Sequence, residues 1–432
     1  MILRVLLALL SALSLSLAGA MPARAAALCD STTKRLVPLT ELGAVTYAGQ
    51  PGGLYPGGVN TMPAGHLAAG LAHAAAITPL DTLGAPSANG RIVVLSVGMS
   101  NTTQEYSTFI PLANGSGLMN PRVLLVDGAQ GGQTAAVFAN PAANAWTVIE
   151  NRLRNAGVRA TQVQAVWLKE ANAGPTQGFP AAAQLLRDDL RAIVQNLHAK
   201  FPNLKLCYLS SRIYAGYASS ALNPEPYAYE SAFAVRWLIE EQLDGSAALN
   251  PDSSAGPVMA PWLAWGPYLW ADGLVPRADG LTWECVDFST TDGTHPATSG
   301  RDKVAQRLLE YFTIAPTAAP WFSLQNVAVE PTPVAAGTGL RIAALWPNPS
   351  RGALFASVHA PRAMRARFEL VAIDGRVVRR LPEVQLMAGP NTLHWNRLTG
   401  ASSGRDDLAA GVYMLRLGAG GGAARRFVVI SR

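Results

Sequence analysis

The sequence predicts a three-layer α/β domain built on a parallel sheet, followed by a small all-β sandwich. Aliphatic and β-branched runs alternate with helical patterns between residues 91 and 312. The predicted strands are Arg91–Val97, Arg122–Val126, Ala165–Leu168 and Lys205–Ser210. Strands that alternate with helices are typical of a parallel sheet with helices on both faces. From residue 340 onward, short alternating runs separated by turn residues replace this pattern, as expected of an antiparallel sandwich.

The chain begins with the pattern of a secretory signal peptide over residues 1–25. Arg4 supplies the charged start, Val5–Leu17 the apolar stretch, and small residues ending at Ala20 or Ala25 the cleavage site. The apolar stretch is too short to span a membrane, and no later segment reaches ~18 uninterrupted apolar residues. We therefore expect a secreted protein, extracellular or at the cell surface, without a transmembrane segment.

Composition and charge narrow the choice of partners. Charged residues make up 14% of the 432 residues, and the net charge is +6. From Glu330 onward, 14 arginines, no lysines and 6 acidic residues give +8, so the preceding part carries −2. Basic residues are not interleaved with aromatic ones in a stripe, which argues against a nucleic-acid partner.

The remaining elements follow in order along the chain. Residues 26–90, rich in glycine, proline and alanine, are expected to form an N-terminal arm with a helix over Ala64–Ile77. Further helices are predicted at Asn144–Ala156 (Asn144 as N-cap, Gly157 as stop), Ala183–Lys200 and Arg301–Phe312. Residues 91–315 form the α/β domain, 316–339 a linker and 340–432 the sandwich. The sandwich strands are predicted at Phe355–His359, Arg367–Ile373, Arg376–Leu381, Thr392–Trp395, Val412–Leu417 and Arg426–Ile430.

Three cysteines in an exported protein leave at least one of them unpaired. Cys207 lies in the mostly apolar run Leu204–Leu209 and is expected to be buried as a small apolar residue. If a disulfide forms, we favour Cys29–Cys285, which would join the N-terminal arm to the loop that precedes the candidate site.

Polar or glycine-containing motifs follow three of the predicted strands. Ser100 follows the first strand, Gly131-Gly132 the second and Asn172 the third. Because the carboxyl ends of parallel strands share one edge, these residues are expected to meet there. A serine nucleophile, backbone N–H groups freed by glycine and a side-chain amide are what acyl transfer requires. Each motif alone has a simpler explanation: a helix cap for Ser100 and turns for the glycines and Asn172.

Asp292-x-x-His295 supplies the proton acceptor that a serine nucleophile needs. The three-residue spacing lets the aspartate orient the imidazole while the other ring nitrogen faces the serine. The remaining histidines lack a comparable acidic partner, although His66 could line the site. Asp287 remains an alternative for the triad acid.

Together, Gly98–Asn101, Gly128–Thr134, Glu170–Ala173 and Asp292–Pro296 resemble the four motif blocks of the SGNH hydrolase superfamily, the GDSL-like esterases. The resemblance covers roughly residues 90–312 and implies a flavodoxin-like parallel sheet. It also implies a catalytic triad and an oxyanion hole, and neither a metal nor a cofactor. The triad would be Ser100, Asp292 and His295, and the oxyanion hole Ser100, Gly132 and Asn172.

Two residues depart from the family's pattern. Met99 stands in place of the aspartate in Gly-Asp-Ser, and Glu170 in place of the glycine in Gly-x-Asn-Asp. Asn101 after the serine resembles the Gly-Gln-Ser-Asn branch, which includes sialate and xylan O-acetylesterases. This similarity favours carbohydrate esters as substrates.

Aromatic residues near the predicted strand ends favour the same substrates. Trp265, Trp270 and Tyr214 are expected to bind sugar rings, with core packing as the alternative. Arg212 is expected either to bind a substrate carboxylate or to pair with Glu230.

The last domain resembles the C-terminal sorting domains of type IX secretion and the related flagellar-hook-cap-like immunoglobulin modules. The matching pieces are Trp346–Pro349, Asp374–Arg376, Leu408–Tyr413 and Arg426–Ile430. The resemblance implies contact with secretion machinery or the cell surface, and a β-sandwich spacer is the alternative.

The expected function is that of a secreted serine esterase that removes O-acyl groups, acetyl foremost, from carbohydrate or another small ester. Two alternatives stay open. One is a catalytically silent carbohydrate-binding or adhesion protein, motivated by Met99 and Glu170. The other is a lipid esterase, motivated by the apolar composition.

Overall fold

The computed structural model describes Cys29 and residues 33–324, 340–346, 354–372, 376–395, 411–417 and 424–429. The chain divides into two compact units, Met1–Val327 and Ala328–Arg432. The expected signal peptide, most of the expected linker and parts of the C-terminal motifs lie outside the described residues. None of the described helices is long and apolar enough to cross a membrane.

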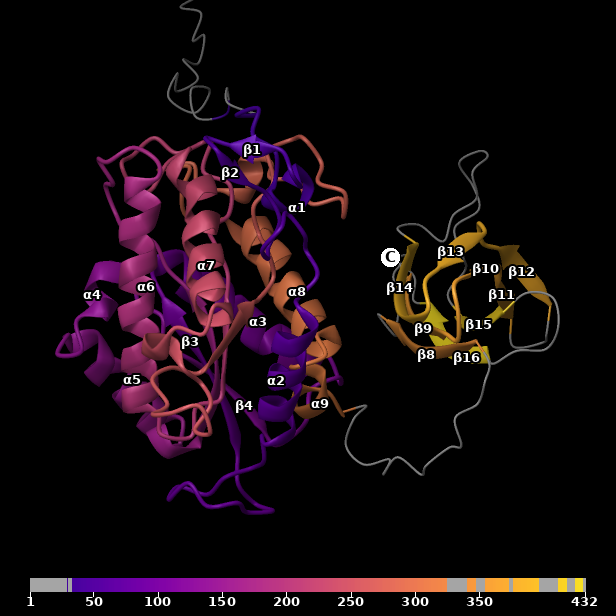
Figure 1. The fold of residues 1–432 in the computed structure, drawn as a ribbon, viewed down its shortest axis with the longest axis horizontal. Coiled ribbons are helices and arrows are strands. Elements are labelled where there is room, and N and C mark those ends of the chain that lie inside the picture. Colours follow the sequence, from indigo (N-terminus) through magenta and orange to yellow (C-terminus); the bar gives the residue numbers. More distant parts are fainter. Residues whose placement is uncertain are drawn as a thin grey trace, which may run out of the picture. The chain divides into compact units, whose positions relative to one another are not determined.

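A five-stranded sheet forms the centre of the first unit (Figure 1). Its strands are β3 (Ile92–Gly98), β4 (Val123–Asp127), β5 (Val163–Lys169), β6 (Leu206–Leu209) and β7 (Trp262–Trp265). They are ordered β4-β3-β5-β6-β7, and every neighbouring pair is parallel. All residues of β3 and β5 are buried, as expected of strands covered on both faces. The predicted parallel sheet is confirmed, and it contains one strand, β7, that was not predicted.

Helices flank the sheet in two layers (Figure 1). The main helices are α2 (Ala64–Ala75), α3 (Ser100–Gly115), α5 (Asn144–Asn155), α6 (Ala181–Lys200), α7 (Tyr227–Leu243) and α8 (Thr298–Ile314). The short α4 (Ala135–Ala139) packs with α5 and α6, and α6 packs on α7. The other group comprises α3, α8, α2 and α9 (Ala319–Phe322). The predicted helix at Asn144 begins there, but its N-cap is Ala143, and no side chain caps it.

Both ends of the first unit pack into the core more closely than the sequence suggested. The expected arm contains α1 (Leu39–Leu42) and a hairpin of β1 (Thr46–Tyr47) and β2 (Gln50–Pro51). Leu39 and Tyr55 are buried, and the Leu39 N–H donates to the Tyr268 hydroxyl at 3.1 Å. At the other end, Trp321 and Phe322 of α9 are buried. Residues 316–324 are therefore not a linker, because their aromatic side chains complete the core.

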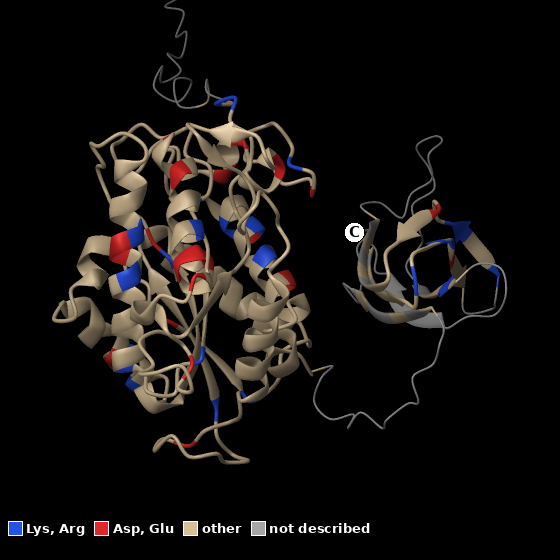
Figure 2. Cartoon of the chain, viewed as in Figure 1, with Lys and Arg blue, Asp and Glu red and all other residues tan. Residues whose placement is uncertain are grey.

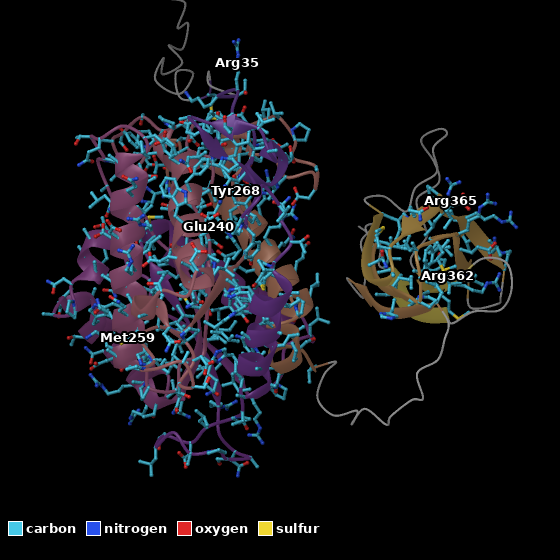
Figure 3. All side chains as sticks on the ribbon, in the orientation of Figure 1. Arg35, Glu240, Met259, Tyr268, Arg362 and Arg365 are labelled. Atoms are coloured by element: carbon cyan, nitrogen blue, oxygen red, sulfur yellow. A yellow bond between two sulfur atoms is a disulfide. The ribbon has the colours of Figure 1, made fainter. Side chains whose placement is uncertain are left out.

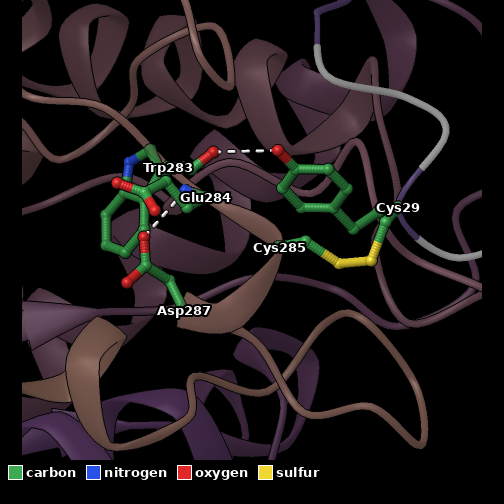
Figure 4. Close-up of a disulfide and its surroundings, with 6 residues drawn as sticks. Cys29, Trp283, Glu284, Cys285 and Asp287 are labelled. Carbon is green, nitrogen blue, oxygen red and sulfur yellow. Dashed lines mark hydrogen bonds between the residues drawn. A yellow bond between two sulfur atoms is a disulfide. The ribbon is translucent and has the colours of Figure 1, made fainter. Parts of the chain in front are cut away.

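The cysteine prediction is confirmed. Cys29 and Cys285 form a disulfide (Figure 4). Cys207 is free and buried. Cys285 opens a short 3₁₀ turn, Cys285–Asp287, ahead of the Asp292–His295 loop. The disulfide therefore attaches the start of the described chain to the segment that leads into this loop. Two further 3₁₀ turns lie at Ala160–Gln162 and Ala247–Leu249.

The second unit consists of small antiparallel sheets. Its strands are β8 (Arg341–Trp346), β9 (Leu354–Ala360), β10 (Met364–Ala366), β11 (Phe368–Ala372), β12 (Val377–Arg380), β13 (Val384–Leu386), β14 (Gly389–Trp395), β15 (Gly411–Leu417) and β16 (Ala424–Val429). The sheet orders are β12-β11-β15-β16, β14-β9-β8 and β10-β13. Residues of all three sheets, such as Val358, Leu386 and Leu415, share one apolar core. Basic residues predominate among its charges (Figure 2), and Arg362 and Arg365 are exposed (Figure 3).

Candidate active site

The site is built where β3 ends and α3 begins. A Cβ atom at Gly98 would lie 2.2 Å from the carbonyl oxygen of Lys169, so only glycine lets the ends of β3 and β5 approach this closely. Two residues later, Ser100 is the first residue of the 16-residue helix α3. The first N–H groups of a helix have no intrahelical acceptor, and the helix dipole favours negative charge there. Ser100 is thus placed where a developing anion is stabilised.

Ser100, His295 and Asp292 form a continuous hydrogen-bonded chain. Ser100 Oγ lies 2.8 Å from His295 Nε2, and His295 Nδ1 lies 2.8 Å from Asp292 Oδ2. The other carboxylate oxygen accepts the backbone N–H groups of Thr294 at 2.8 Å and His295 at 2.9 Å. Partial burial alone would raise the pKa of Asp292, but these donors and the imidazole hold its pKa below the ordinary value. The aspartate is therefore ionised and orients the imidazole toward the serine.

The loop that carries His295 is held from two sides. Asn101, buried at the start of α3, donates from Nδ2 to the carbonyl of Thr294 at 3.0 Å. On the other side, a Cβ atom at Gly293 would lie 2.0 Å from the carbonyl oxygen of Tyr217, and Gly293 has φ +61°. The Ser219 N–H also donates to the carbonyl of Asp292 at 2.9 Å. These contacts fix the distance between imidazole and serine.

Gly132 follows β4 and lines the cavity beside Ser100. Its φ of +74° is a left-handed conformation that glycine adopts without strain. The Gln130 N–H donates to the carbonyl of Gly98 at 2.8 Å, and its side-chain amide donates to the carbonyl of Ala145 at 2.9 Å. The β4 loop is therefore anchored to the β3 end with Gly132 at its exposed turn.

Asn172 follows β5, and its amide is oriented by two partners. Its Oδ1 accepts the Ala136 N–H at 3.1 Å, and its Nδ2 donates to Asp189 Oδ2 at 2.6 Å. Only one of the two Nδ2 hydrogens is needed for Asp189, so the second remains to donate into the cavity that Asn172 lines. The sequence did not assign Asp189 to the site, because it lies 17 residues from Asn172, on α6.

These residues surround a cavity of about 160 Å³. Its lining residues are Met99, Ser100, Asn101, Gly132, Gln133, Thr134, Ala171, Asn172, Ala173, Arg212, Leu222, Asn223, Thr294 and His295. The structure thus brings four of the expected residues, Ser100, Gly132, Asn172 and His295, to one cavity. Asp292 lies behind His295, to which it is hydrogen-bonded.

The aromatic residues expected to bind sugar are instead part of the core. Trp265 lies on β7, and its indole N–H donates to the carbonyl of Leu54 at 2.7 Å. Trp270 is fully buried and donates to Glu225 Oε1 at 2.7 Å. Tyr214 is also fully buried, with its ring 6.1 Å from that of Trp270. The alternative of core packing is therefore correct for all three.

Of the four residues expected to bind substrate, Arg212 alone lines the cavity, and its side chain is only 2% exposed. It does not pair with Glu230. The Oε1 of Glu230 accepts the Tyr47 hydroxyl at 2.7 Å, and its Oε2 has no partner among the described residues. Asp287 pairs with Lys303 at 2.5 Å and does not contact the His295 ring, so this alternative for the triad acid is wrong.

His66 is likewise not part of the site. Its ring stacks on Trp262, and its Nε2 lies 2.7 Å from the carbonyl oxygen of Leu263. Among the residues that the structure describes, no cluster of three or more histidine, cysteine, aspartate or glutamate side chains is arranged to hold a metal ion.

A buried ion pair links the end of β5 to helix α3, and it was not predicted from the sequence. Lys169 Nζ lies 2.6 Å from both carboxylate oxygens of Glu105, and both side chains are fully buried. Burial lowers the pKa of Lys169 to about 8 and raises that of Glu105. Thr102 Oγ1 also donates to the Lys169 carbonyl at 2.7 Å. The end of β5 is therefore fastened to the nucleophile helix α3.

No family model and no curated protein matches the chain. Among solved structures, a candidate acylhydrolase from Bacteroides fragilis is 14% identical over 58% of this chain and 97% of its own, with a TM-score of 0.29. A salicylyl-acyltransferase of a tetracycline biosynthetic pathway is 13% identical over 54% of this chain and 58% of its own, with a TM-score of 0.30. PorU from Porphyromonas gingivalis is 21% identical over 22% of this chain, with a TM-score of 0.19, and this chain spans 9% of PorU.

Proposed function

We propose that this chain is an exported serine ester hydrolase of the SGNH type that removes short O-acyl groups, acetyl foremost, from carbohydrate. The observation that carries the proposal is the hydrogen-bonded chain from Asp292 through His295 to Ser100 at the wall of a small cavity. Counted from β3, the strand order 2-1-3-4-5 is that of flavodoxin-like sheets, as the motif resemblance implies.

In the proposed reaction, Ser100 Oγ attacks the ester carbonyl while His295 Nε2 takes the serine proton. Asp292 holds the Nδ1–H and stabilises the imidazolium that forms. The Ser100 N–H, the Gly132 N–H and the free Nδ2 hydrogen of Asn172 donate to the oxyanion. Collapse of the intermediate expels the alcohol, which takes the proton from Nε2. Water then attacks the acyl-serine, gives its proton to His295, and the acid leaves as Ser100 is restored.

The substrate class rests on the cavity and on the motif. A cavity of about 160 Å³ suits a short acyl group better than a fatty acyl chain. The Asn101 motif and the polar side chains of Gln133, Thr134 and Asn223 in the wall support an alcohol with hydroxyl groups. On p-nitrophenyl esters, we expect kcat/KM to fall steeply beyond butyrate, whereas a lipid esterase would favour longer chains.

The export proposal rests on the N-terminal pattern and on the Cys29–Cys285 disulfide, which is typical of oxidising compartments. We propose that the second unit directs the protein to secretion machinery or to the cell surface. Mass spectrometry of the protein isolated after export would test both proposals. The N-terminal residue shows whether the signal peptide was removed, and the mass shows whether the second unit was lost or retained.

The first experiment is acetate release from p-nitrophenyl acetate and acetylated glycans by the mature protein. Ser100→Ala is expected to lower turnover roughly 1,000-fold or more, because the nucleophile is lost. Ser107→Ala, an exposed serine on the same helix, is the matched control and keeps full activity. Retained activity in folded Ser100→Ala would contradict the proposal. Folded wild-type protein without activity and without fluorophosphonate labelling of Ser100 would favour a binding protein.

A further inference from the structure

Arg212 lines the cavity, and two of its three guanidinium nitrogens make no hydrogen bond in the described chain. Its side chain is 2% exposed, and its Nε and Nη2 have no hydrogen-bond partner in the described chain. The third nitrogen, Nη1, lies 3.7 Å from Met99 Sδ, a weak acceptor. Buried arginines are ordinarily paired, because an isolated charge is costly to remove from water. Two free donors on a buried cation therefore indicate a missing anionic partner.

The neighbouring carboxyl groups are engaged elsewhere. Both oxygens of Glu105 are held by Lys169 at 2.6 Å. Glu225 accepts the Trp270 indole at 2.7 Å and the backbone N–H groups of Ala215 and Tyr229 at 2.9 Å each. None of the ion pairs among the described residues includes Arg212. Glu105 and Glu225 therefore leave the N–H donors of the Arg212 guanidinium free.

Glu170 does not provide the missing charge either. Burial raises the pKa of Glu170 well above its ordinary range, which favours the neutral form of its carboxyl. Its Oε2 accepts the Ala171 N–H at 3.1 Å, and no hydrogen bond joins it to Arg212. The charge of Arg212 therefore remains available to a ligand.

We propose that Arg212 is an anion-binding subsite and that the preferred ester carries a carboxylate. This inference rests on the proposed function, because Arg212 and Ser100 line the same cavity of about 160 Å³. The planar guanidinium can bind a carboxylate through two N–H donors. Because Arg212 and Ser100 line the same cavity, we expect this carboxylate to lie a few bonds from the scissile carbonyl. Asn223 Oδ1, also without a partner in the described chain, is a second free group on this wall and accepts a substrate hydroxyl.

The carboxylate can belong to the acyl half or to the alcohol half of the ester, and matched substrates separate the two. Monoethyl succinate against ethyl butyrate tests the acyl half. 4-Acetoxybenzoate against 4-acetoxybenzamide tests the alcohol half. The quantity compared is the ratio of kcat/KM for the charged ester to that for the neutral ester. We expect wild type to prefer the charged ester on the order of tenfold or more in one arm, as hydrogen bonds to a charged group imply.

Arg212→Gln is expected to bring that ratio to about one, whatever happens to overall turnover. Arg301→Gln is the matched control. Arg301 also has a buried Nε without a partner in the described chain, but it does not line the cavity. The ratio measured for Arg301→Gln is expected to stay at the wild-type value. A wild-type ratio near one in both arms would overturn the subsite, and this outcome needs no folded variant. A preference that survives in Arg212→Gln would overturn it as well.

Binding to Ser100→Ala separates this inference from the proposed function. Calorimetry with monoethyl succinate and 4-acetoxybenzoate measures affinity when hydrolysis is blocked. If Ser100→Ala binds a charged ester and Ser100→Ala/Arg212→Gln does not, while wild type hydrolyses none of the four esters, the subsite holds and the esterase fails. If wild type hydrolyses the charged and neutral esters equally well, the esterase stands and the subsite fails.

Discussion

Glu170 places a carboxyl group beside the cavity, where the SGNH pattern has glycine. The side chain is 2% exposed, its Oε2 accepts the Ala171 N–H, and its Oε1 has no partner among the described residues. Burial raises the pKa of this carboxyl well above its ordinary range. Burial therefore favours the neutral form of the group, which does not repel the oxyanion proposed next to Asn172. The departure from the family pattern is compatible with catalysis for this reason.

The raised pKa of Glu170 predicts a pH-dependent effect of Glu170→Gln on stability. In the unfolded chain the carboxyl ionises near its ordinary pKa of ~4.3, while the folded chain keeps its proton to higher pH. Wild type therefore loses stability as pH rises above that value, and the neutral glutamine does not. We expect the two proteins to unfold alike near pH 4 in urea, and the variant to become the more stable one as pH rises above that. A stability difference independent of pH would contradict this.

The junction between β3 and α3 depends on the absence of a side chain at Gly98. A Cβ atom there would lie 2.2 Å from the Lys169 carbonyl oxygen and 2.5 Å from Thr102 Oγ1. Gly98→Ala would therefore force β3 and β5 apart and move Ser100 relative to His295. We expect a loss of ~1–3 kcal/mol in the free energy of unfolding and roughly 100-fold in kcat/KM.

The control for this junction is Gly178→Ala, at a position where a Cβ atom meets nothing within 4 Å. It is expected to change neither quantity measurably. Urea unfolding and p-nitrophenyl acetate kinetics on the three proteins provide the test. Wild-type activity in Gly98→Ala would contradict the claim that a methyl group at this position forces β3 and β5 apart.

The buried pair Lys169–Glu105 joins strand β5 to helix α3 and predicts a strongly non-additive result. Lys169→Met leaves the Glu105 carboxylate buried without its cation, at an expected cost of ~3–5 kcal/mol. Lys169→Met/Glu105→Leu replaces both groups with apolar side chains of similar volume and should recover most of that loss. Urea unfolding of wild type, Lys169→Met, Glu105→Leu and the double variant measures the coupling between the two side chains. Additive losses would contradict a direct interaction.

At the scale of the whole molecule, local patterns predicted much of the fold and the cluster of site residues. Alternating strands and helices placed Ser100, Gly132 and Asn172 at one sheet edge, and the spacing of Asp292 and His295 linked them to it. Long-range packing was not predictable. Trp-Leu-Ala-Trp over 262–265 resembles an aromatic surface as much as a strand, and α7 is buried on most sides and so lacks a clear periodicity.

Buried pairs were missed for the same physical reason. Lys169 and Glu105 lie 64 residues apart, and only the approach of β5 to α3 brings their charges together. Likewise, Trp270 is fully buried and donates to Glu225, 45 residues away in the sequence, and no local pattern indicates this contact.

The two units are expected to fold and function separately, because each has its own apolar core. The core of the first unit draws its buried residues from Leu39 through Phe322, and that of the second from Ile342 through Leu417, with no residue in common. The proposed catalytic residues all belong to the first unit. A chain ending at Val327 is therefore expected to keep kcat/KM for p-nitrophenyl acetate within a few-fold of the mature protein. Calorimetry of the mature protein should show two transitions, and the truncated chain should retain only its own. A single cooperative transition in the mature protein, with loss of activity on truncation, would instead mean that the second unit stabilises the catalytic fold.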